Sequence, residues 1–474
     1  MGTIDILIVA AYFVGMIALG LYSRKKVTNM DDFVLSGRQL GVFTLVSTIM
    51  ATMVGTGMTM GSVSNAYRLG ATGTVLWAFG GFGLGLIAFA FMTGKVRETG
   101  KRTMAEVISS KFGKTSRLIS AIVLVGYAIA LMAINIAGLR TVIIAIGGEA
   151  LQISIPMATA IAAAVAIFYG SIGGFFAVAR LDRFQLMIII LGIIILGPVI
   201  SVGYAGGLAP IAETFTSMGL SLTNPLYTGL STAALGFFLA MFVTVPGDPS
   251  MPQRALAGKS NSTTKKAFII SGFIAFAMGI SLLLVGAATQ VLHPGLENPD
   301  VALAHLILNN YPTILMGFTV AALFAAVISS FDSFMILGST HLIYDIGGYM
   351  GLKADEKQVK KITSVATVVM GIIALIIALF ITELFAYLYM VFSILGSSLV
   401  PTFIAGLFFA DKVSRVAANA SMIIGAIVPV FLFLTYGWDV FLGDPIFIGM
   451  FFSIATLVIL SVVVKDKDKP QKES

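Results

Sequence analysis

The sequence predicts an all-α polytopic membrane protein, from its composition, its long apolar stretches and the placement of its basic residues. Of its 474 residues, 58% are hydrophobic and only 11% are charged, whereas soluble domains carry roughly 25% charged residues. The chain has no cysteine, which excludes a disulfide framework and thiol chemistry. Basic residues follow the apolar stretch 3–22 and do not precede it, so we expect a retained first helix and not a cleaved signal peptide.

Thirteen stretches have the roughly 20 mainly apolar residues that a membrane-spanning helix needs. One long apolar block near the carboxyl end is divided into two spans at Thr382 and Glu383. The predicted spans are residues 3–22, 42–66, 71–93, 118–147, 153–172, 184–204, 229–250, 267–290, 313–343, 362–381, 383–408, 416–437 and 441–464.

Lysine and arginine lie almost entirely in alternate connections between these spans. Of the 29 basic residues, 27 fall in the connections 23–41, 94–117, 173–183, 251–266, 344–361 and 409–415 and in the tail after residue 464. Only Arg68 and Arg140 lie elsewhere. Because cytoplasmic connections collect basic residues, we expect a multi-pass plasma-membrane protein with its amino terminus outside and its carboxyl terminus in the cytoplasm. The net charge of +7 is then a topology signal and not a nucleic-acid patch.

Ten of the spans, within residues 42–408, divide into two blocks of five. Five is odd, so the second block must cross the membrane with the opposite polarity, an arrangement typical of secondary transporters whose interrupted helices form the site. The first span of each block contains such an interruption, "MVGTGMTMG" (53–61) and "VTVPGDPSMP" (243–252), although glycine in membrane helices also serves close packing. The predicted units are residues 1–41 (first helix and loop), 42–204 (repeat one), 205–410 (repeat two) and 411–474 (two helices and a tail).

The ninth predicted span carries a polar cluster inside an apolar helix. Its segment "AAVISSFDS" (325–333) contains Ser329, Ser330, Asp332 and Ser333. A dehydrated Na⁺ ion takes about five or six oxygens, which unwound carbonyls and hydroxyls supply inside a bilayer. The interrupted second span would free carbonyls around Ala51–Val54, and the ninth span would add the Ala326 carbonyl and the two adjacent serine hydroxyls. A serine bonded to its own helix would need no ion, and both interpretations stay open on these residues alone.

Two carboxylates accompany this cluster. A charged Asp332 at mid-bilayer would cost about 2.5–3.5 kcal/mol, so we expect it to be paired, protonated, bound to an ion or hydrated. Asp182 lies in "FFAVARLDRFQ" (175–185), between Arg180 and Arg183. From spacing alone, a carboxylate neutralised at the cytoplasmic rim is the favoured interpretation of Asp182.

Four segments, in their order and spacing, resemble the sodium/solute symporter family of sodium/proline, pantothenate, sialic acid and sodium/glucose carriers. They are "ATMVGTG" (51–57), "YGSIGGFFAVARLDRFQ" (169–185), "GDPSMPQRALAGKS" (247–260) and "LFAAVISSFDSFMILGSTHLIYDI" (323–346). The resemblance covers residues 5–410 and implies a five-plus-five inverted-repeat core like that of the leucine transporter. It also implies a Na⁺ site made by the carbonyls of Ala51, Val54 and Ala326 and the hydroxyls of Ser329 and Ser330.

The resemblance implies a second ion site and a solute pocket as well. Asp182 matches a functional acid of the family, and some members hold a second sodium ion between that acid and three positions that are here Ser329, Asp332 and Ser333. Because Asp332 replaces a hydroxyl, two carboxylates could hold a cation or share a proton. The pocket positions implied are Met53, Gly55, Met58, Trp77 and Asn135. Arg140 could clamp a solute carboxylate or reach the outer surface from the end of its helix.

We therefore expect a Na⁺-coupled symporter that imports a small organic solute by alternating access. An amino acid, a monocarboxylate or a vitamin-like acid fits the apolar pocket positions better than a sugar, whose hydroxyls would stay unpaired. The expected partners are the solute, Na⁺ and the lipid bilayer, with no nucleic acid and no obligate protein partner. A proton-coupled carrier with Asp182 and Asp332 as the relay is the alternative. The spans are too apolar for a channel, and the three histidines are too scattered for an enzyme.

Overall fold

Every regular element in the described part of the chain is a helix, as a bilayer requires when no sheet closes into a barrel. The computed structural model describes residues 1–24, 35–151, 153–170, 175–352, 356–436 and 445–464. Its α-helices are α1 (Thr3–Arg24), α3 (Val42–Met53), α4 (Ser62–Leu69), α5 (Val75–Glu98), α6 (Met104–Phe112), α7 (Lys114–Leu151), α8 (Ile155–Gly170), α9 (Phe175–Ile189), α10 (Leu196–Tyr204), α11 (Leu208–Ser217), α12 (Thr232–Gly247), α13 (Ser250–Ala257), α14 (Asn261–Leu292), α15 (Ala302–Asn310), α16 (Leu315–Thr340), α17 (Glu356–Ala378), α18 (Leu384–Phe408), α19 (Arg415–Tyr436) and α20 (Pro445–Val463).

Seven short helices join or extend these elements. Three are π-helices, which in membrane and soluble proteins often mark functional sites: η2 (Gly57–Gly61), η4 (Ile190–Ile195) and η6 (His341–Gly347). The others are the 3₁₀-helices η1 (Ser36–Arg38), η3 (Gly70–Thr72), η5 (Pro299–Val301) and η7 (Ala410–Lys412).

The described residues contain 9 helices long and apolar enough to cross a membrane, or up to 11 when each of two bent pairs counts as one span. The predicted spans 153–172 and 362–381 coincide with apolar helices of only 10–17 residues, Ile155–Phe168 and Val365–Ala378. At 1.5 Å per residue, apolar stretches of this length are shorter than a hydrocarbon core of about 30 Å, although α17 as a whole has 23 residues. The predicted count of thirteen is therefore not confirmed, and residues 171–172, 437 and 441–444 of the predicted spans lie outside the described residues.

Both interruptions lie where the sequence predicts them. The segments Val42–Met53 and Gly57–Thr72 meet at 69°, and Thr232–Gly247 meets Ser250–Ala257 at 45°. At the second break, Asp248 adopts an extended backbone (φ −69°, ψ 120°), because the proline that follows it disfavours the helical conformation.

At the first break, Gly55 lies against the serine-bearing helix. A Cβ atom at Gly55 would stand 2.7 Å from Ser330 Oγ and 2.9 Å from Asn135 Oδ1. Only glycine therefore allows this approach of α3 to α16 and α7.

Two predicted connections are wrong at their boundaries. Helix α9 begins at Phe175 and not at residue 184, so Asp182 lies inside a helix, with 0% of its surface exposed. The predicted cytoplasmic connection 251–266 contains most of α13, all of whose residues are buried. Hydropathy assigns charged residues such as Asp182 and Arg254 to water, although here both are buried.

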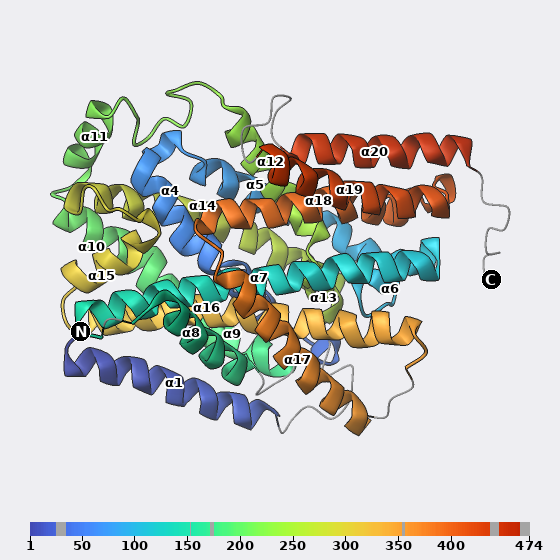
Figure 1. Ribbon diagram of the computed structural model, residues 1–474, viewed down its shortest axis with the longest axis horizontal. Coiled ribbons are helices and arrows are strands. Elements are labelled where there is room, and N and C mark those ends of the chain that lie inside the picture. Colours follow the sequence, from blue (N-terminus) through green and yellow to red (C-terminus); the bar gives the residue numbers. More distant parts are fainter. Residues whose placement is uncertain (25–34, 152, 171–174, 353–355, 437–444, 465–474) are drawn as a thin grey trace.

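Helix α16 lies at the centre of the bundle. Its most apolar window is 100% buried, against 22% for the windows of α1 and α20, which run along opposite edges of the molecule in Figure 1. Helix α16 packs against α7, α9, α1 and α3. Helix α1 begins at one end of the bundle and α20 ends at the other (Figure 1). The central position of α16 explains why its hydroxyls can meet other helices instead of lipid.

Candidate functional site

The hydroxyls of α16 meet the carbonyl groups that the break in α3 leaves available. Ser329 Oγ donates to the Ala51 carbonyl at 2.7 Å and approaches the Ala326 carbonyl at 3.2 Å. Ser330 Oγ donates to the Thr52 carbonyl at 2.7 Å and lies 3.3 Å from the Ala51 carbonyl. The structure thus brings together four of the five oxygens predicted for Na⁺, from two segments far apart in the sequence.

The break explains why these carbonyls are available. In a continuous helix the Thr52 carbonyl would accept the Thr56 N–H four residues later, but that N–H donates to Asn135 Oδ1 at 3.1 Å. Val54, the fifth predicted position, leaves the helical conformation (φ −80°, ψ 42°) in the same turn. Its N–H still donates to the Met50 carbonyl at 2.9 Å, so the helix ends at this turn.

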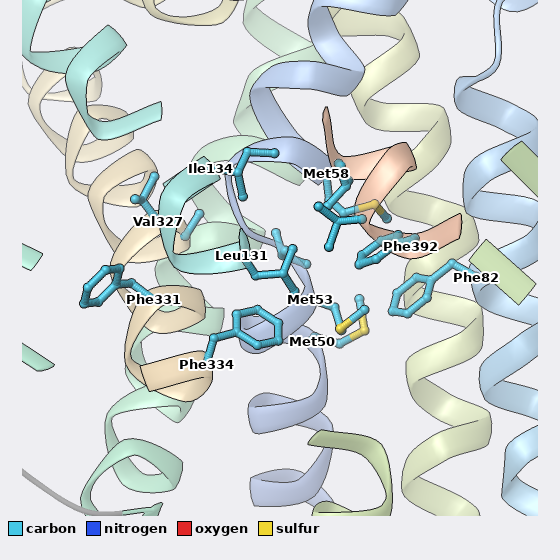
Figure 2. Packing of buried hydrophobic residues seen from close by; sticks show 14 of the residues in the cluster. Met50, Met53, Met58, Phe82, Leu131, Ile134, Val327, Phe331, Phe334 and Phe392 are labelled. Carbon is cyan, nitrogen blue, oxygen red and sulfur yellow. The ribbon is translucent and has the colours of Figure 1, made fainter. Parts of the chain in front are cut away.

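A narrow cavity adjoins this contact. Its walls include four of the six predicted solute positions: Met53, Gly55, Met58 and Asn135. Figure 2 shows Met53 and Met58 on the broken helix, facing Leu131 and Ile134 of α7, Phe334 of α16 and Phe392. The cavity holds about 20 Å³, roughly the room that one water molecule needs. A solute would therefore require these walls to move apart.

The other two predicted solute positions, Trp77 and Arg140, are not part of the lining of this cavity. The Arg140 guanidinium donates to the carbonyls of Ala378 at 2.9 Å and Ile381 at 3.1 Å. These carbonyls close the carboxyl end of α17, where a cation is favoured by the helix dipole.

A second polar cluster lies one turn further along α16. Ser333 Oγ and Thr52 Oγ1 are 2.7 Å apart, and the guanidinium of Arg254 donates to both hydroxyls. Neither carboxylate oxygen of Asp182 accepts a hydrogen bond from a described residue, and the same holds for Asp332 Oδ1. Oxygens buried in this way suit a cation or a proton.

Sequence reasoning missed Thr52 and Arg254 as members of this cluster. Thr52 is the residue after the predicted Ala51, so the turn that places the Ala51 carbonyl at the site also places the Thr52 hydroxyl near it. On sequence alone, Arg254 is one of the basic residues of the connection 251–266 that predict topology. Its position shortly after the break in the first span of the second block is the signal that could have identified it.

Comparison with known proteins gives one family and several relatives. The model of the family described as "Sodium:solute symporter family" matches residues 33–425. The osmoregulated proline transporter OpuE of Bacillus subtilis (strain 168) is 24% identical, with 100% of this chain and 97% of that protein aligned. The sodium/pantothenate symporter of Haemophilus influenzae is 26% identical, over 90% of this chain and 89% of that protein.

Two solved structures have a similar fold. A substrate-bound, outward-open Na⁺-coupled sialic acid symporter matches with a TM-score of 0.81 and 20% identity, over 98% of each chain. Mhp1, a nucleobase-cation-symport-1 family transporter in a closed conformation, matches with a TM-score of 0.62 and 14% identity, over 92% of this chain and 94% of that one.

Proposed function

The chain belongs to the sodium:solute symporter family. From this premise we propose that it imports a small organic solute by alternating access, driven by Na⁺ that enters down its own gradient. Like its curated relatives, it is a membrane transporter and not an enzyme. We further propose that residues 42–204 and 205–410 are inverted repeats, with the amino terminus outside and the carboxyl terminus in the cytoplasm. The bent pair at the start of each block supports the repeat.

The contact between α3 and α16 carries this proposal. A sodium ion there would exchange the hydrogen bonds from Ser329 and Ser330 for ion–oxygen contacts, since a hydroxyl oxygen has two acceptor lone pairs. The carbonyls of Ala51, Val54 and Ala326 complete the proposed ligand set. The ion would tie α3 to α16 and favour one arrangement of the cavity, which raises solute affinity through linkage.

The cavity favours a solute with few hydroxyl groups. Its polar side chains are Thr52, Thr56, Asn135 and Ser330, among methionine, leucine, isoleucine and phenylalanine walls. A sugar would leave several hydroxyls unpaired there. We therefore propose an amino acid, a monocarboxylate or a vitamin-like acid, as the proline and pantothenate relatives suggest. Arg140 could contribute to binding a carboxylate only after releasing the end of α17.

The second cluster is proposed to hold a further cation or a proton. Asp182 and Asp332 supply carboxylate oxygens, and Ser329 and Ser333 supply hydroxyls on one face of α16. A proton-coupled carrier that uses the two carboxylates is the competing mechanism. Uptake that is driven by a pH gradient and does not depend on Na⁺ would favour that mechanism over sodium coupling.

The sodium gradient supplies enough free energy for accumulation. One charge crossing ~100 mV yields about 2.3 kcal/mol, and a tenfold concentration ratio adds about 1.4 kcal/mol. Together, roughly 3.7 kcal/mol supports about 400-fold accumulation per sodium ion. One coupled ion is therefore sufficient for active uptake.

A thermal-shift screen of the purified protein identifies the solute. Amino acids, monocarboxylates, vitamin-like acids and sugars are each added with and without Na⁺, and the Tm of the protein is measured in each case. We expect an acid of the first three classes to raise the Tm only when Na⁺ is present. A solute that stabilises equally without Na⁺ would contradict sodium coupling.

The sodium site is tested by Ser329→Ala combined with Ser330→Ala. Losing two ligands should raise the Na⁺ concentration for half-maximal uptake at least tenfold, taking about 1.4 kcal/mol per decade. Ser339→Ala is the matched control, because Ser339 is buried on the same helix and donates to its own backbone at Ile336. The same Na⁺ dependence in the double variant as in the control would exclude the site.

A further inference from the structure

Asp5 is a buried carboxylate in the first turn of α1, with 0% of its surface exposed. Its Oδ1 accepts the N–H groups of Ile314 at 2.9 Å and Gly317 at 3.0 Å, and its Oδ2 accepts the Gly2 N–H at 3.0 Å. Ile314 directly precedes α16 and Gly317 lies in its first turn, where N–H groups have no acceptor within their own helix. A side chain of α1 therefore caps α16.

Helices α1 and α16 pack against each other and run in the same direction. Asp5 lies beside Gly317, and further along both helices the rings of Phe13 and Phe324 are 5.1 Å apart. A Cβ atom at Gly317 would stand 2.7 Å from Asp5 Cα and 2.8 Å from the Asp5 carbonyl oxygen. Glycine therefore permits this close approach, and the carboxylate fixes it.

The shared direction of the two helices explains why residue 5 is an acid. The amino-terminal end of a helix carries a partial positive charge, and helices that run the same way place two such ends side by side. The Asp5 carboxylate serves both ends, since it accepts from Gly2 before α1 and from two N–H groups at the start of α16. An amide could accept these bonds but would not offset the charge.

Asp5 also holds a residue with an unusual backbone conformation. Ile314 has φ 78° and ψ −54°, which is strained for a β-branched residue. Such a conformation persists only where surrounding contacts hold it, and Asp5 provides the acceptor for the Ile314 N–H. The contact therefore fixes where α16 begins.

The start of α16 is connected rigidly to the proposed sodium site. Helix α16 is continuous from Leu315 to Thr340, so a shift or rotation at Gly317 reaches Ser329, roughly 18 Å further along the axis. The hydroxyls of Ser329 and Ser330 meet carbonyls of α3 at 2.7 Å. A binding site requires such groups to be held within about 0.5 Å of their working positions.

We propose that Asp5 is a positioning residue for sodium binding: it fixes α16 against α1 so that Ser329 and Ser330 face the broken turn of α3. Helix α1, which lies outside the two repeats, thereby contributes to the affinity for Na⁺. This inference rests on the proposed function, because it takes the proposed sodium site as its reference.

The Na⁺ concentration that half-saturates the protein tests this inference. Radioactive Na⁺ is titrated onto the purified full-length protein in lipid nanodiscs, and thermal unfolding gives the Tm of each variant. We expect Asp5→Ala to raise the half-saturating concentration by about threefold or more, with the wild-type number of ions bound at saturation. Asp5→Asn should raise it less, because the amide oxygen still accepts from α16 but carries no charge.

Ser414→Ala is the matched control for the loss of a buried cap. Ser414 accepts the Ala417 N–H at 3.2 Å at the start of α19, a helix that provides no proposed ligand. This variant should lower the Tm and leave the half-saturating concentration unchanged. Gly317→Ala tests the claim from α16: its methyl group forces α1 away, so the half-saturating concentration should rise.

The outcomes separate this inference from the proposed function. A wild type without saturable Na⁺ binding would overturn the proposed function itself. Saturable binding with the wild-type half-saturating concentration in Asp5→Ala, or an equal rise in Ser414→Ala, would overturn the role of Asp5 alone. If Asp5→Ala does not fold, Asp5→Asn and Gly317→Ala decide: a rise in both supports the inference, and any other result refutes it.

Discussion

The side chain of Asn135 replaces a backbone hydrogen bond that the broken helix loses. Its Oδ1 accepts from the Thr56 N–H at 3.1 Å and from the Thr56 hydroxyl at 3.2 Å, and its Nδ2 donates to the Leu131 carbonyl at 2.7 Å. Asn135 also lines the cavity. One amide therefore holds the unwound turn in place and faces the proposed solute.

We predict that Asn135→Ala destabilises the protein and weakens solute binding together. The change leaves a buried Thr56 N–H without its acceptor, at a cost of about 1–3 kcal/mol. Thermal unfolding and solute titration of the purified protein measure the two effects. Asn309→Ala is the control, since Asn309 is exposed and bonds within its own helix. Equal Tm and affinity in both variants would show that Asn135 does not support the break.

At the scale of the elements, glycine allows helices to touch along their backbones. A Cβ atom at Gly81 on α5 would overlap the Phe238 carbonyl of α12, and one at Gly83 would stand 2.9 Å from the Gly272 carbonyl of α14. Small residues serve this purpose between membrane helices, where packing replaces the hydrophobic effect. The glycines of α5 are thus packing residues, whereas Gly55 permits a break and a close approach at the proposed sodium site.

We predict that two Gly→Ala changes in helices differ in their effect on stability. Gly81→Ala should lower stability by about 1–3 kcal/mol because backbone atoms of α12 cannot yield to the new methyl group. Gly126→Ala meets nothing within 4 Å and should be neutral or stabilise the protein by up to about 1 kcal/mol. Thermal unfolding in one detergent compares them, and a Gly81→Ala protein as stable as Gly126→Ala would contradict the packing found here.

At the scale of the whole molecule, one buried carboxylate at each end of the bundle connects neighbouring helices. Asp345, beyond α16, accepts from Arg117 Nε at 2.7 Å and pairs with His341 Nδ1 at 2.8 Å, which ties η6 to α7. Asp300, before α15, accepts the Leu384 N–H at 2.9 Å and so caps α18. Helices α15 and α6 mark these opposite ends in Figure 1. Alternating access, as proposed, requires the two ends to open in turn.

The Asp300 contact predicts a pH-dependent stability. Burial raises the pKa of Asp300 above its ordinary value of 3.8, although the Leu384 N–H and nearby Arg68 act in the opposite direction. The folded protein therefore keeps this proton to a higher pH than the unfolded chain, and the contribution of Asp300 to stability falls as the pH rises from about 4 through the raised pKa.

Asp300→Asn removes the titration and keeps an oxygen that can accept from Leu384. The Tm of Asp300→Asn relative to the wild type should therefore rise as the pH is raised from about 4 to about 7. A pH series of thermal unfolding curves measures this difference. A constant difference, or one that falls with pH, would contradict the role assigned to Asp300.

Local sequence features were sufficient to predict the breaks and the contact between α3 and α16. Gly55 and Gly57 weaken the helix at the first break, and Pro249 disfavours the helical conformation of Asp248 at the second. Ser329 and Ser330 stand out because the rest of their span is apolar.

The turn Ala51–Val54, Ala326 and the two serines are candidate ligands on local features alone. The choice of Ala51 and Val54 within that turn, and most of the solute positions, required the family resemblance, and all of them remain proposals. Hydropathy places Arg254 in water, as it does every arginine, and only its position just after the second break indicates a role inside the bundle.

The amino-acid sequence alone predicts a helical membrane protein and the two places where its helices break, and both are found in the structure. These properties depend on residues that are neighbours in the chain: runs of apolar side chains, glycine, and the proline that follows Asp248. The three-dimensional arrangement of the helices is what buries Asp182 and Arg254, brings Arg140 to the end of α17 and makes the cavity narrow. Burial and charge pairing depend on groups from distant segments, and the free energy of a buried charge is set by those partners.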